Sequence, residues 1–252
     1  MRLAIAGKGG AGKTTISATA ARLAARSGAR VVAIDADSNP NLGAALGHHA
    51  SSQGAATPTL PPSLVSRRLD GPRFLQPLDL VLDEHAVTAP DGVQLIAMGA
   101  PAHAEEGCLC SAHAVISSLL ADLGDQPDLL AVIDLEASPE HLSRGTTSHA
   151  DVLLLVAEPY YRALEAVRRL ADLARELPIP RVAVIANKVR SPDDGDAIAA
   201  YCDRHGLEQV ATIAWSDDVL AADTSGRAVL DAAPGSPVVR SVDRLLTTIG
   251  AR

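Results

Sequence analysis

The chain has 252 residues, 47% of them hydrophobic but only 2% aromatic, and its formal net charge is −8. This length suits one large α/β domain over residues 1–252, and the acidic charge argues against a general nucleic-acid surface, which needs a basic excess. Three cysteines do not make a disulfide framework, and no apolar run approaches the length of a membrane span. We therefore expect a cytoplasmic protein that neither binds nucleic acid nor inserts stably into a membrane.

The N-terminal segment has the pattern of a strand, a glycine-rich loop and a helix. An apolar run over residues 3–6 comes first, and an Ala-rich stretch with high helix propensity continues to Arg26. Between them the chain reads Gly7-Lys8-Gly9-Gly10-Ala11-Gly12-Lys13-Thr14-Thr15. Glycines let successive N–H groups point at phosphate oxygens, Lys13 would reach the β- and γ-phosphates, and the Thr14 hydroxyl would ligate Mg²⁺. In this context the loop predicts a nucleoside triphosphate site rather than an ordinary turn.

A second lysine, Lys8, follows the first glycine, although Lys13 already supplies the cation that such a loop needs. This pattern resembles the deviant-Walker ATPases, the class of nitrogenase iron protein, MinD, ParA and ArsA. The resemblance implies a homodimer that closes on ATP and Mg²⁺, with Lys8 reaching the phosphates of the partner as an arginine finger does elsewhere. The alternative is a solvated lysine on the rim of the loop.

An apolar run over residues 30–34 predicts a second strand, and Asp35 and Asp37 follow it. Carboxylates at the carboxyl end of a strand beside a phosphate loop lie where a Mg²⁺ shell or an attacking water would be. The resemblance implies that Asp37 orients the hydrolytic water and that Asp35 supports the site. Both could instead cap the helix that follows.

The stretch over residues 48–76 is rich in small residues and proline, and we expect a surface excursion there. Two strands are then expected, over residues 78–82 and 93–98, around a turn at Pro90-Asp91-Gly92.

Two cysteines, Cys108 and Cys110, stand two residues apart. In an extended backbone their sulfurs project to the same side and can clip one metal ion. A tetrahedral thiophilic site prefers four thiolates, which a symmetric dimer with the clip on its two-fold axis would supply. Alone, the pair is also compatible with buried reduced cysteines on a helix cap. His113 is a candidate auxiliary ligand or a residue that faces its own helix.

Within the deviant-Walker class, the segment Gly-Cys-x-Cys-x-x-His resembles the CooC-type maturation factors of nickel-dependent carbon monoxide dehydrogenase. The block that begins at Asp134 follows the same group, with Glu136-Ala137 and Glu140-His141-Leu142. The likeness runs over nearly the full length and is weakest over residues 48–76. It implies that Cys108 and Cys110 hold Ni²⁺ or Zn²⁺ between subunits, and that the client is a metalloenzyme, carbon monoxide dehydrogenase.

A fully apolar stretch over residues 129–133 predicts a strand that ends at Asp134. An aspartate in this place serves the Mg²⁺ shell and the Thr14 hydroxyl in phosphate-loop enzymes. The segment after it would be a second switch, with Glu140 near the dimer face. The family usually has glycine at the position of Ser138, and the narrower backbone choice of serine leaves the rate of hydrolysis open.

Further strands are expected over residues 152–157, 181–186 and 209–214, with helices over residues 161–177, 219–223 and 237–249. The resemblance implies that the amide of Asn187 reads the adenine edge and favours ATP over GTP, although an asparagine at a strand end can also close a turn. Trp215 lies where the family wraps the adenine. The C-terminal helix lacks the basic apolar face of a membrane anchor.

These patterns predict an α/β fold of the phosphate-loop NTPase type, with a doubly wound, mostly parallel sheet of seven or eight strands and helices on both faces. We expect a Mg²⁺-dependent ATPase that converts ATP to ADP and inserts nickel into a metalloenzyme. The alternatives are a ParA/MinD-like positioning or regulatory ATPase and a nucleotide sensor with little turnover.

Overall fold

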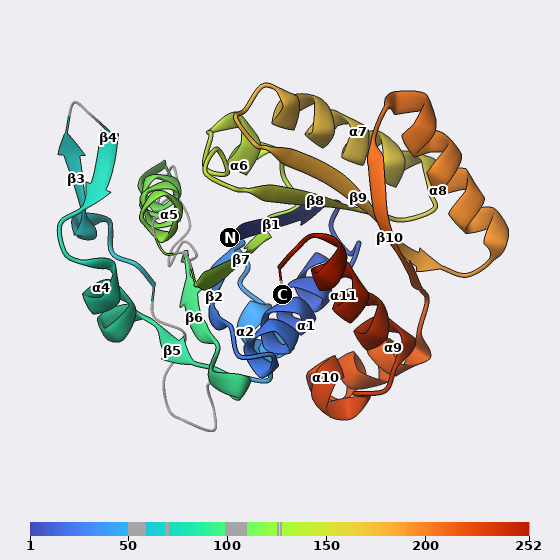
Figure 1. The fold of residues 1–252 in the computed structure, drawn as a ribbon, viewed down its shortest axis with the longest axis horizontal. Helices are drawn as coiled ribbons and strands as arrows, with labels where there is room; N and C mark the ends of the chain where they lie inside the picture. Colours follow the sequence, from blue (N-terminus) through green and yellow to red (C-terminus); the bar gives the residue numbers. More distant parts are fainter. Residues whose placement is uncertain (50–58, 69–70, 99–109, 125, 127, 252) are drawn as a thin grey trace.

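The computed structural model describes residues 1–49, 59–68, 71–98, 110–124, 126 and 128–251. Within them, an eight-stranded sheet has the order β10-β9-β8-β1-β7-β2-β6-β5 (Figure 1). Neighbouring strands are parallel, except that β5 runs antiparallel to β6. The strands are β1 Arg2–Gly7, β2 Arg30–Ala36, β5 Val87–Thr88, β6 Gln94–Ala97, β7 Leu129–Leu135, β8 Val152–Ala157, β9 Arg181–Val189 and β10 Glu208–Ala214.

Helices cover both faces of this sheet, as the core residues of β1 illustrate. Leu3 and Ile5 pack into one apolar cluster, whereas Ala4 and Ala6 pack into the other, because successive side chains of a strand point to opposite faces. The first cluster is completed by α1 Lys13–Arg26, α2 Leu42–Leu46, α9 Asp217–Thr224, α10 Val229–Ala232 and α11 Pro237–Thr248. The second is completed by α4 Leu78–His85, α5 Cys110–Leu123, α7 Tyr161–Arg175 and α8 Pro192–His205.

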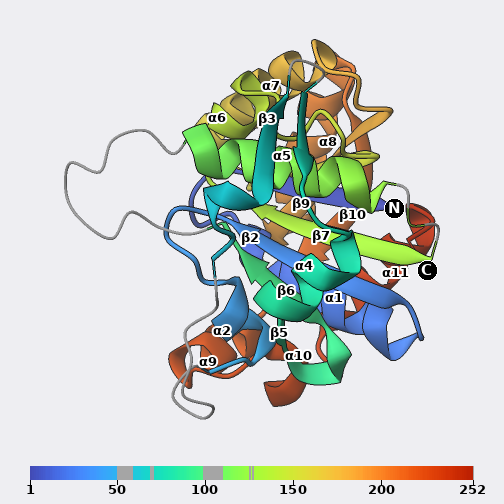
Figure 2. The same ribbon diagram turned by 90° about the vertical axis from the view of Figure 1, so that its left-hand side faces the viewer.

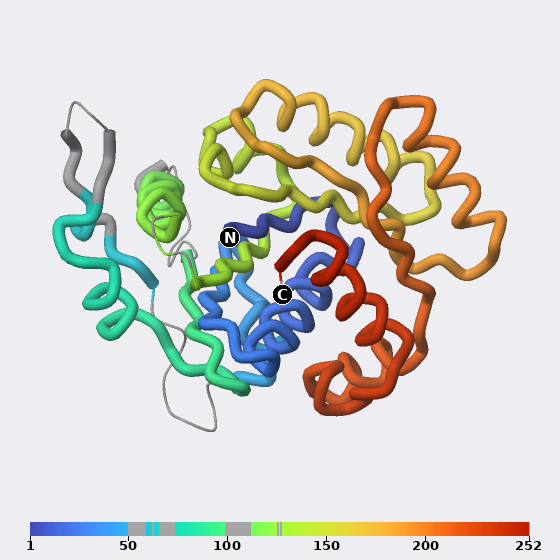
Figure 3. Tube along the Cα trace, viewed as in Figure 1, coloured from blue at the N-terminus to red at the C-terminus, as the bar shows by residue number. Residues whose placement is uncertain are grey.

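Figure 3 shows the two central helices of the first face, α1 and α11, side by side under the sheet. The doubly wound, mostly parallel fold expected from the sequence is therefore confirmed. No helix in the described ranges combines the length and the apolar character needed to cross a membrane.

The strand expected over residues 78–82 is wrong, because this segment begins helix α4. Pro77 precedes the helix in an extended conformation, with φ −55° and ψ 141°. Leu78, Val81 and Leu82 are buried while Leu80 is 50% exposed, which is a helical spacing of i, i+3 and i+4 and not the alternation of a strand. The turn at Pro90–Gly92, a 3₁₀ segment labelled η2, and the strand β6 after it agree with the expectation.

The described end of the 48–76 excursion has regular structure that the sequence pattern did not indicate. A 3₁₀ turn, η1 Pro62–Leu64, leads into an antiparallel hairpin of β3 Val65–Arg68 and β4 Gly71–Phe74. Figure 2 shows this hairpin lying across α5, away from the main sheet.

The topology brings the segments expected to bind nucleotide to one edge of the sheet. β1 lies between β7 and β8, and β2 lies on the other side of β7, all parallel. In this register Ile5 and Asp35 are both partners of Asp134. The loop after β1 and the carboxylates of β2 and β7 therefore meet where the strands end, which is where open α/β sheets bind ligands.

Candidate nucleotide site

The loop between β1 and α1 is held in a shape that requires glycine at its two ends. Gly7 has φ +146°, and a Cβ there would lie 2.6 Å from the carbonyl oxygen of Val156. Gly12 has φ +100° and caps α1, and a Cβ there would meet the Asn187 amide nitrogen. α1 has no side-chain cap at its start, so its first N–H groups remain for an anion at the positive end of the helix.

Lys13, the first residue of α1, is 7% exposed, and its Nζ donates to the carbonyl oxygen of Lys8 at 3.4 Å. Burial lowers the pKa of Lys13, and the carboxylates of Asp134, Asp37 and Glu136 oppose that shift. The ammonium group thus lies among acidic groups inside the loop, in a place where phosphate oxygens can accept from it. Lys8 itself is exposed.

Asp134 is 2% exposed at the end of β7, and Ser17 Oγ lies 3.1 Å from its Oδ1. Burial raises the pKa of Asp134 to about 7, a hydrogen bond from Thr14 opposes the rise, and the neighbouring Asp35 adds to it. A buried carboxylate beside a hydroxyl at the start of α1 is a donor set that suits Mg²⁺, a hard cation that takes oxygen ligands. Thr14 and Asp134 therefore fit the Mg²⁺ site expected from the sequence.

Asp35 and Asp37 have different surroundings. Asp35 is 2% exposed and accepts from the backbone N–H groups of Leu42 at 2.8 Å and Asp37 at 3.2 Å. Burial raises the pKa of Asp35, and these backbone hydrogen bonds oppose the rise. Asp37 is half-buried and accepts from the N–H of Asn39 at 2.8 Å. Asp35 therefore anchors both ends of the 37–42 segment, and Asp37 is the carboxylate nearer the surface.

The segment after Asp134 touches the loop through small residues, since a Cβ at Gly9 would lie 3.7 Å from Cβ of Ala137. Ser138 Oγ accepts from the N–H of Glu140 at 3.3 Å. The Glu140 carboxylate is exposed, pairs with Arg144 at 3.3 Å and lies 3.8 Å from His113 Nε2, so the contacts described for it are with its own segment and with α5, and not with the loop. Its role at the dimer face stays a prediction.

A cavity of about 370 Å³ extends from the loop toward the ends of β9 and β10. Asn187 lines it, is 7% exposed, and donates from Nδ2 to the carbonyl oxygen of Ala11 at 2.7 Å. It lies within β9 rather than after it, so it does not have the alternative role of closing a turn, and its contact with the adenine edge stays a prediction.

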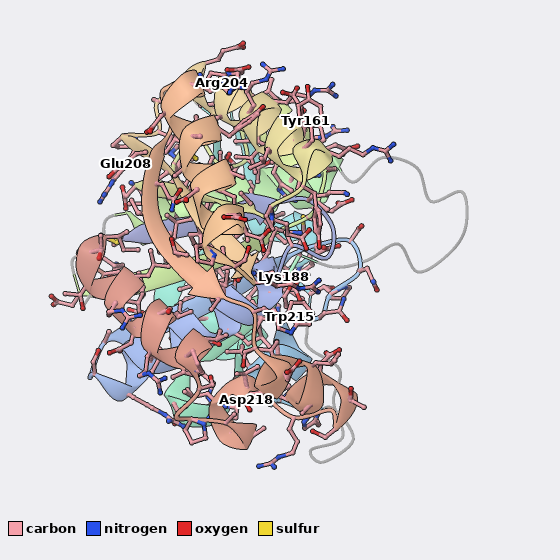
Figure 4. All side chains as sticks on the ribbon, turned by 90° about the vertical axis from the view of Figure 1, so that its right-hand side faces the viewer. Tyr161, Lys188, Arg204, Glu208, Trp215 and Asp218 are labelled. Carbon is pink, nitrogen blue, oxygen red and sulfur yellow. The ribbon has the colours of Figure 1, made fainter. Side chains whose placement is uncertain are left out.

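Trp215 lines the outer part of the cavity, directly after β10. Its N–H donates to the carbonyl oxygen of Val189 at 2.9 Å, and its indole Nε1 donates to Asp217 Oδ1 at 3.0 Å. The guanidinium carbon of Arg190 stands 4.3 Å from the ring centroid, a cation–π contact that covers one face. Figure 4 shows Trp215 and Lys188 at the same end of the β9–β10 pair.

Lys188 contacts the loop, a role that the sequence did not indicate. Its Nζ donates to the carbonyl oxygen of Gly10 and to Glu158 Oε1 at 2.9 Å, and its backbone has φ +58°. Together with Asn187 it fixes two successive carbonyl groups of the loop. The signal for it was an asparagine–lysine pair at the end of a strand predicted to lie beside the phosphate loop.

The cysteine pair is only partly within the structure. Cys108 lies outside the described residues, and Cys110 is the first residue of α5. His113 is 4% exposed and faces Thr146, with 3.1 Å between Nδ1 and Oγ1. Over the described part of the chain, no three His, Cys, Asp or Glu residues are grouped closely enough to hold a metal ion. The metal site therefore stays a prediction.

Comparison with known proteins agrees with this geometry. Residues 3–229 match the CobQ/CobB/MinD/ParA nucleotide binding domain. The carbon monoxide dehydrogenase accessory protein CooC of Rhodospirillum rubrum is 34% identical, over 93% of this chain and 91% of its own. An uncharacterized ATP-binding protein of Methanocaldococcus jannaschii is 29% identical, over 91% of each chain.

Among solved structures, MinD of Pyrococcus horikoshii in complex with Mg-ADP superposes with a TM-score of 0.71 at 17% identity, covering 99% of this chain and 96% of that one. A ParA family ATPase of Chlorobium tepidum gives 0.70 at 21% identity and 96% of each chain. At such identities these likenesses concern the fold. The family match and the CooC relative cover nearly the whole sequence, and this protein belongs to the CobQ/CobB/MinD/ParA nucleotide-binding family.

Proposed function

We propose that this protein is a Mg²⁺-dependent ATPase that works as a homodimer and delivers nickel to a metalloenzyme, carbon monoxide dehydrogenase. The observation that carries the ATPase part is the loop itself. Lys13 is buried among carboxylates at the start of an uncapped helix, and the same loop opens onto the 370 Å³ cavity at Asn187. The nickel part is supported by 34% identity to CooC and by the Cys108-x-Cys110 pair.

In this proposal the residues of one chain divide the work. The loop N–H groups and Lys13 bind the phosphates, and Thr14 and Asp134 hold Mg²⁺, which would neutralise charge on the phosphates. Asp37 orients a water for attack on the γ-phosphate, and its proton passes to solvent. Lys8, exposed on the loop, completes the site of the partner subunit. Ni²⁺ or Zn²⁺ is the cargo, and four thiolates from two chains bind it.

Phosphate release from Mg²⁺-ATP tests the enzyme activity, with Asp37→Ala as the variant and Asp193→Ala, an acid at the start of α8, as a matched control. We expect Asp37→Ala to lose turnover and to keep nucleotide affinity. Equal release by wild type and Asp37→Ala would remove the catalytic assignment.

The cargo is tested separately by equilibrium binding of Ni²⁺ and Zn²⁺ to wild type, Cys108→Ser and Cys202→Ser. Cys202 is buried in α8, and its substitution controls for general loss of a thiol. We expect one metal ion per two chains in wild type and Cys202→Ser. Unchanged binding in Cys108→Ser would exclude the proposed site.

A nucleotide sensor with little turnover is the second candidate, and the Ser138 contact favours it. Ser138 Oγ holds the N–H of Glu140, so this segment has a hydrogen bond that the glycine usual in the family would not make. Wild-type turnover that is no faster than the Asp37→Ala variant, with tight ATP binding, would support the sensor.

A further inference from the structure

Two buried histidines join α5 to the segment that follows Asp134. His113 lies on α5, and His141 lies on the short helix α6 Glu140–Ser143, and they are 4% and 1% exposed. Their ring centroids are 4.5 Å apart, with the ring planes inclined by 58°. The proposed nucleotide chemistry uses neither residue.

His113 makes further contacts with the same segment. Its Nδ1 lies 3.1 Å from Thr146 Oγ1, and its Nε2 lies 3.8 Å from Glu140 Oε2. Glu140 is held in turn by Arg144. One side chain of α5 is therefore in contact with both ends of the 140–146 segment and with the ring in between.

The two buried rings carry polar nitrogen atoms in the interior of the protein. Within the described residues, His113 Nε2 and both ring nitrogens of His141 have no hydrogen-bond partner. The backbone of Ala36 lies near enough to His141 to favour its charged form slightly, but not in hydrogen-bond geometry. Ala36 ends β2 and directly precedes Asp37. A buried polar group without a hydrogen bond lowers the stability of the fold. A movement of the neighbouring segments that gave these nitrogens partners would therefore be favourable.

His113 lies close to the N-terminal end of α5. Cys110 begins the helix three residues before His113, which is about one turn, or about 5 Å along the axis. A helix of this length moves as a unit, because its backbone hydrogen bonds are internal.

We propose that His113 and His141 are positioning residues that couple the nucleotide state of the 134–146 segment to the cysteine end of α5. The inference rests on the proposed function for the identity of the cargo. When ATP draws Ala137 and its neighbours toward the loop, His141 moves with them and pulls or releases His113. By linkage, metal held at the cysteines changes ATP affinity by the same factor as ATP changes metal affinity.

Hydrogen exchange of the α5 amides, with and without Mg²⁺-ATPγS, tests the mechanical link without any metal. The variants are His113→Ala and, as a control, Leu119→Ala, which is equally buried further along α5. We expect nucleotide to change exchange near residues 112–116 in wild type and Leu119→Ala, and not in His113→Ala. His113→Phe restores a ring against His141 and should restore the response.

The energetic link is measured as the ratio of Zn²⁺ affinities with and without Mg²⁺-ATPγS. We expect a ratio of about 5 or more in wild type, and of about 1 in His113→Ala, with ATPγS affinity itself within about threefold. The inference would be overturned if amide exchange of α5 in wild type did not change with nucleotide. It would also be overturned if the ratio of Zn²⁺ affinities in His113→Ala were as large as in wild type. If wild type bound no Zn²⁺ at all, the proposed cargo would be refuted. The exchange experiment would still decide whether nucleotide and α5 are mechanically linked.

Discussion

Asp35 and Asp134 are register partners on the adjacent parallel strands β2 and β7, so two buried carboxyl groups stand side by side at the edge of the sheet. Each has its own anchor. Asp35 is held by the N–H groups of Leu42 and Asp37, and Asp134 has the hydroxyls of Thr14 and Ser17 beside it. Burial raises the pKa of both carboxyl groups, the nearby charge of Asp35 adds to the rise for Asp134, and Mg²⁺ at Thr14 would relieve that repulsion.

The first prediction follows from the unfavourable burial of the ionised Asp134 carboxylate. Asp134→Asn should raise the free energy of unfolding of the nucleotide-free protein by about 2 kcal/mol near pH 8, because an amide does not have to ionise in a buried place. The same variant should lose the Mg²⁺ dependence of ADP affinity. Urea unfolding and calorimetric titration measure the two effects. Asp35→Asn is the comparison, and it should destabilise the protein, because its amide nitrogen cannot accept from the backbone N–H groups.

The second prediction concerns a buried arginine on α1. Arg22 is 3% exposed and joins three segments, through Asp91 at 2.6 Å, Asp231 at 2.7 Å and the carbonyl oxygen of Leu46 at 3.2 Å. Arg22→Met should lower the free energy of unfolding by about 3 kcal/mol, because Asp91 and Asp231 lose their buried partner and keep the longer contacts with Arg26 at 3.1 Å and 3.9 Å. Arg26 also pairs with Asp91, but it is 42% exposed, and Arg26→Ala should cost less than about 1 kcal/mol. Equal losses in the two variants would contradict this assignment.

A third prediction uses the pKa of His141. Burial, together with the neighbouring His113, lowers this pKa from 6.5 to about 4. The folded chain keeps this ring neutral while the unfolded chain takes up a proton below pH 6.5, so the stabilisation is complete above pH 6.5 and is lost as the pH falls toward 4. Between about pH 7.5 and pH 5, wild type should lose about 2 kcal/mol more than His141→Leu. Urea titrations at both pH values measure the difference, and identical losses would show that the ring is protonated when folded.

Much of the fold was predictable because the central strands β1, β2, β7 and β8 are short, mostly buried and mostly apolar. The glycine and lysine spacing of the loop at residues 7–15 also indicates a phosphate-binding loop between a strand and a helix. Leu78–Leu82 was misread because five residues of a short apolar run fit either period, and only the exposure of Leu80 separates them. The β3–β4 hairpin was missed because its stability depends on packing across α5, a contact that the local composition does not reveal.

Within the site, the pairing of residues on adjacent strands could be predicted from the sequence, whereas contacts between more distant segments could not. Register alone brings Asp35 to Asp134, so the order of the parallel strands was sufficient for that pair. The contacts of Lys188 with Gly10 and of His113 with His141 join segments far apart in the chain. The sequence does not identify the partner in either contact, because the partner depends on how far a helix or strand extends before its side chain meets the neighbouring segment.

The fourth prediction concerns reading of the base. The chain has one tryptophan, so the fluorescence of Trp215 reports directly on the outer cavity, and ADP should change it. Asn187→Ala should weaken ADP binding about tenfold, because it removes a buried hydrogen-bonding group. The same variant also frees the carbonyl oxygen of Ala11, which loosens the loop for any nucleotide. Comparing ADP with GDP separates the two effects, since a base contact changes the ratio of affinities and a loosened loop does not.

The fifth prediction separates the two lysines of the loop. Lys13 is buried and Lys8 is exposed, although the carbonyl oxygen of Lys8 accepts from Lys13 Nζ. Lys13→Ala should weaken ATP binding by about 10- to 100-fold, the value of a charge-assisted contact to phosphate. Lys8→Ala should bind ATP almost as wild type does, and its phosphate release should fall by about 10³-fold if Lys8 acts like an arginine finger.

Mixing two inactive variants decides whether Lys8 acts on its own site or on the site of its partner. In a dimer of one Lys8→Ala chain and one Asp37→Ala chain, the first chain keeps Asp37 and receives Lys8 from the second. That one site is then complete, whereas the other lacks both groups. At equal concentrations half of the dimers are mixed and half of their sites are complete, so about a quarter of wild-type phosphate release should return. If Lys8 serves its own chain, neither site in the mixed dimer is complete, and mixing restores nothing.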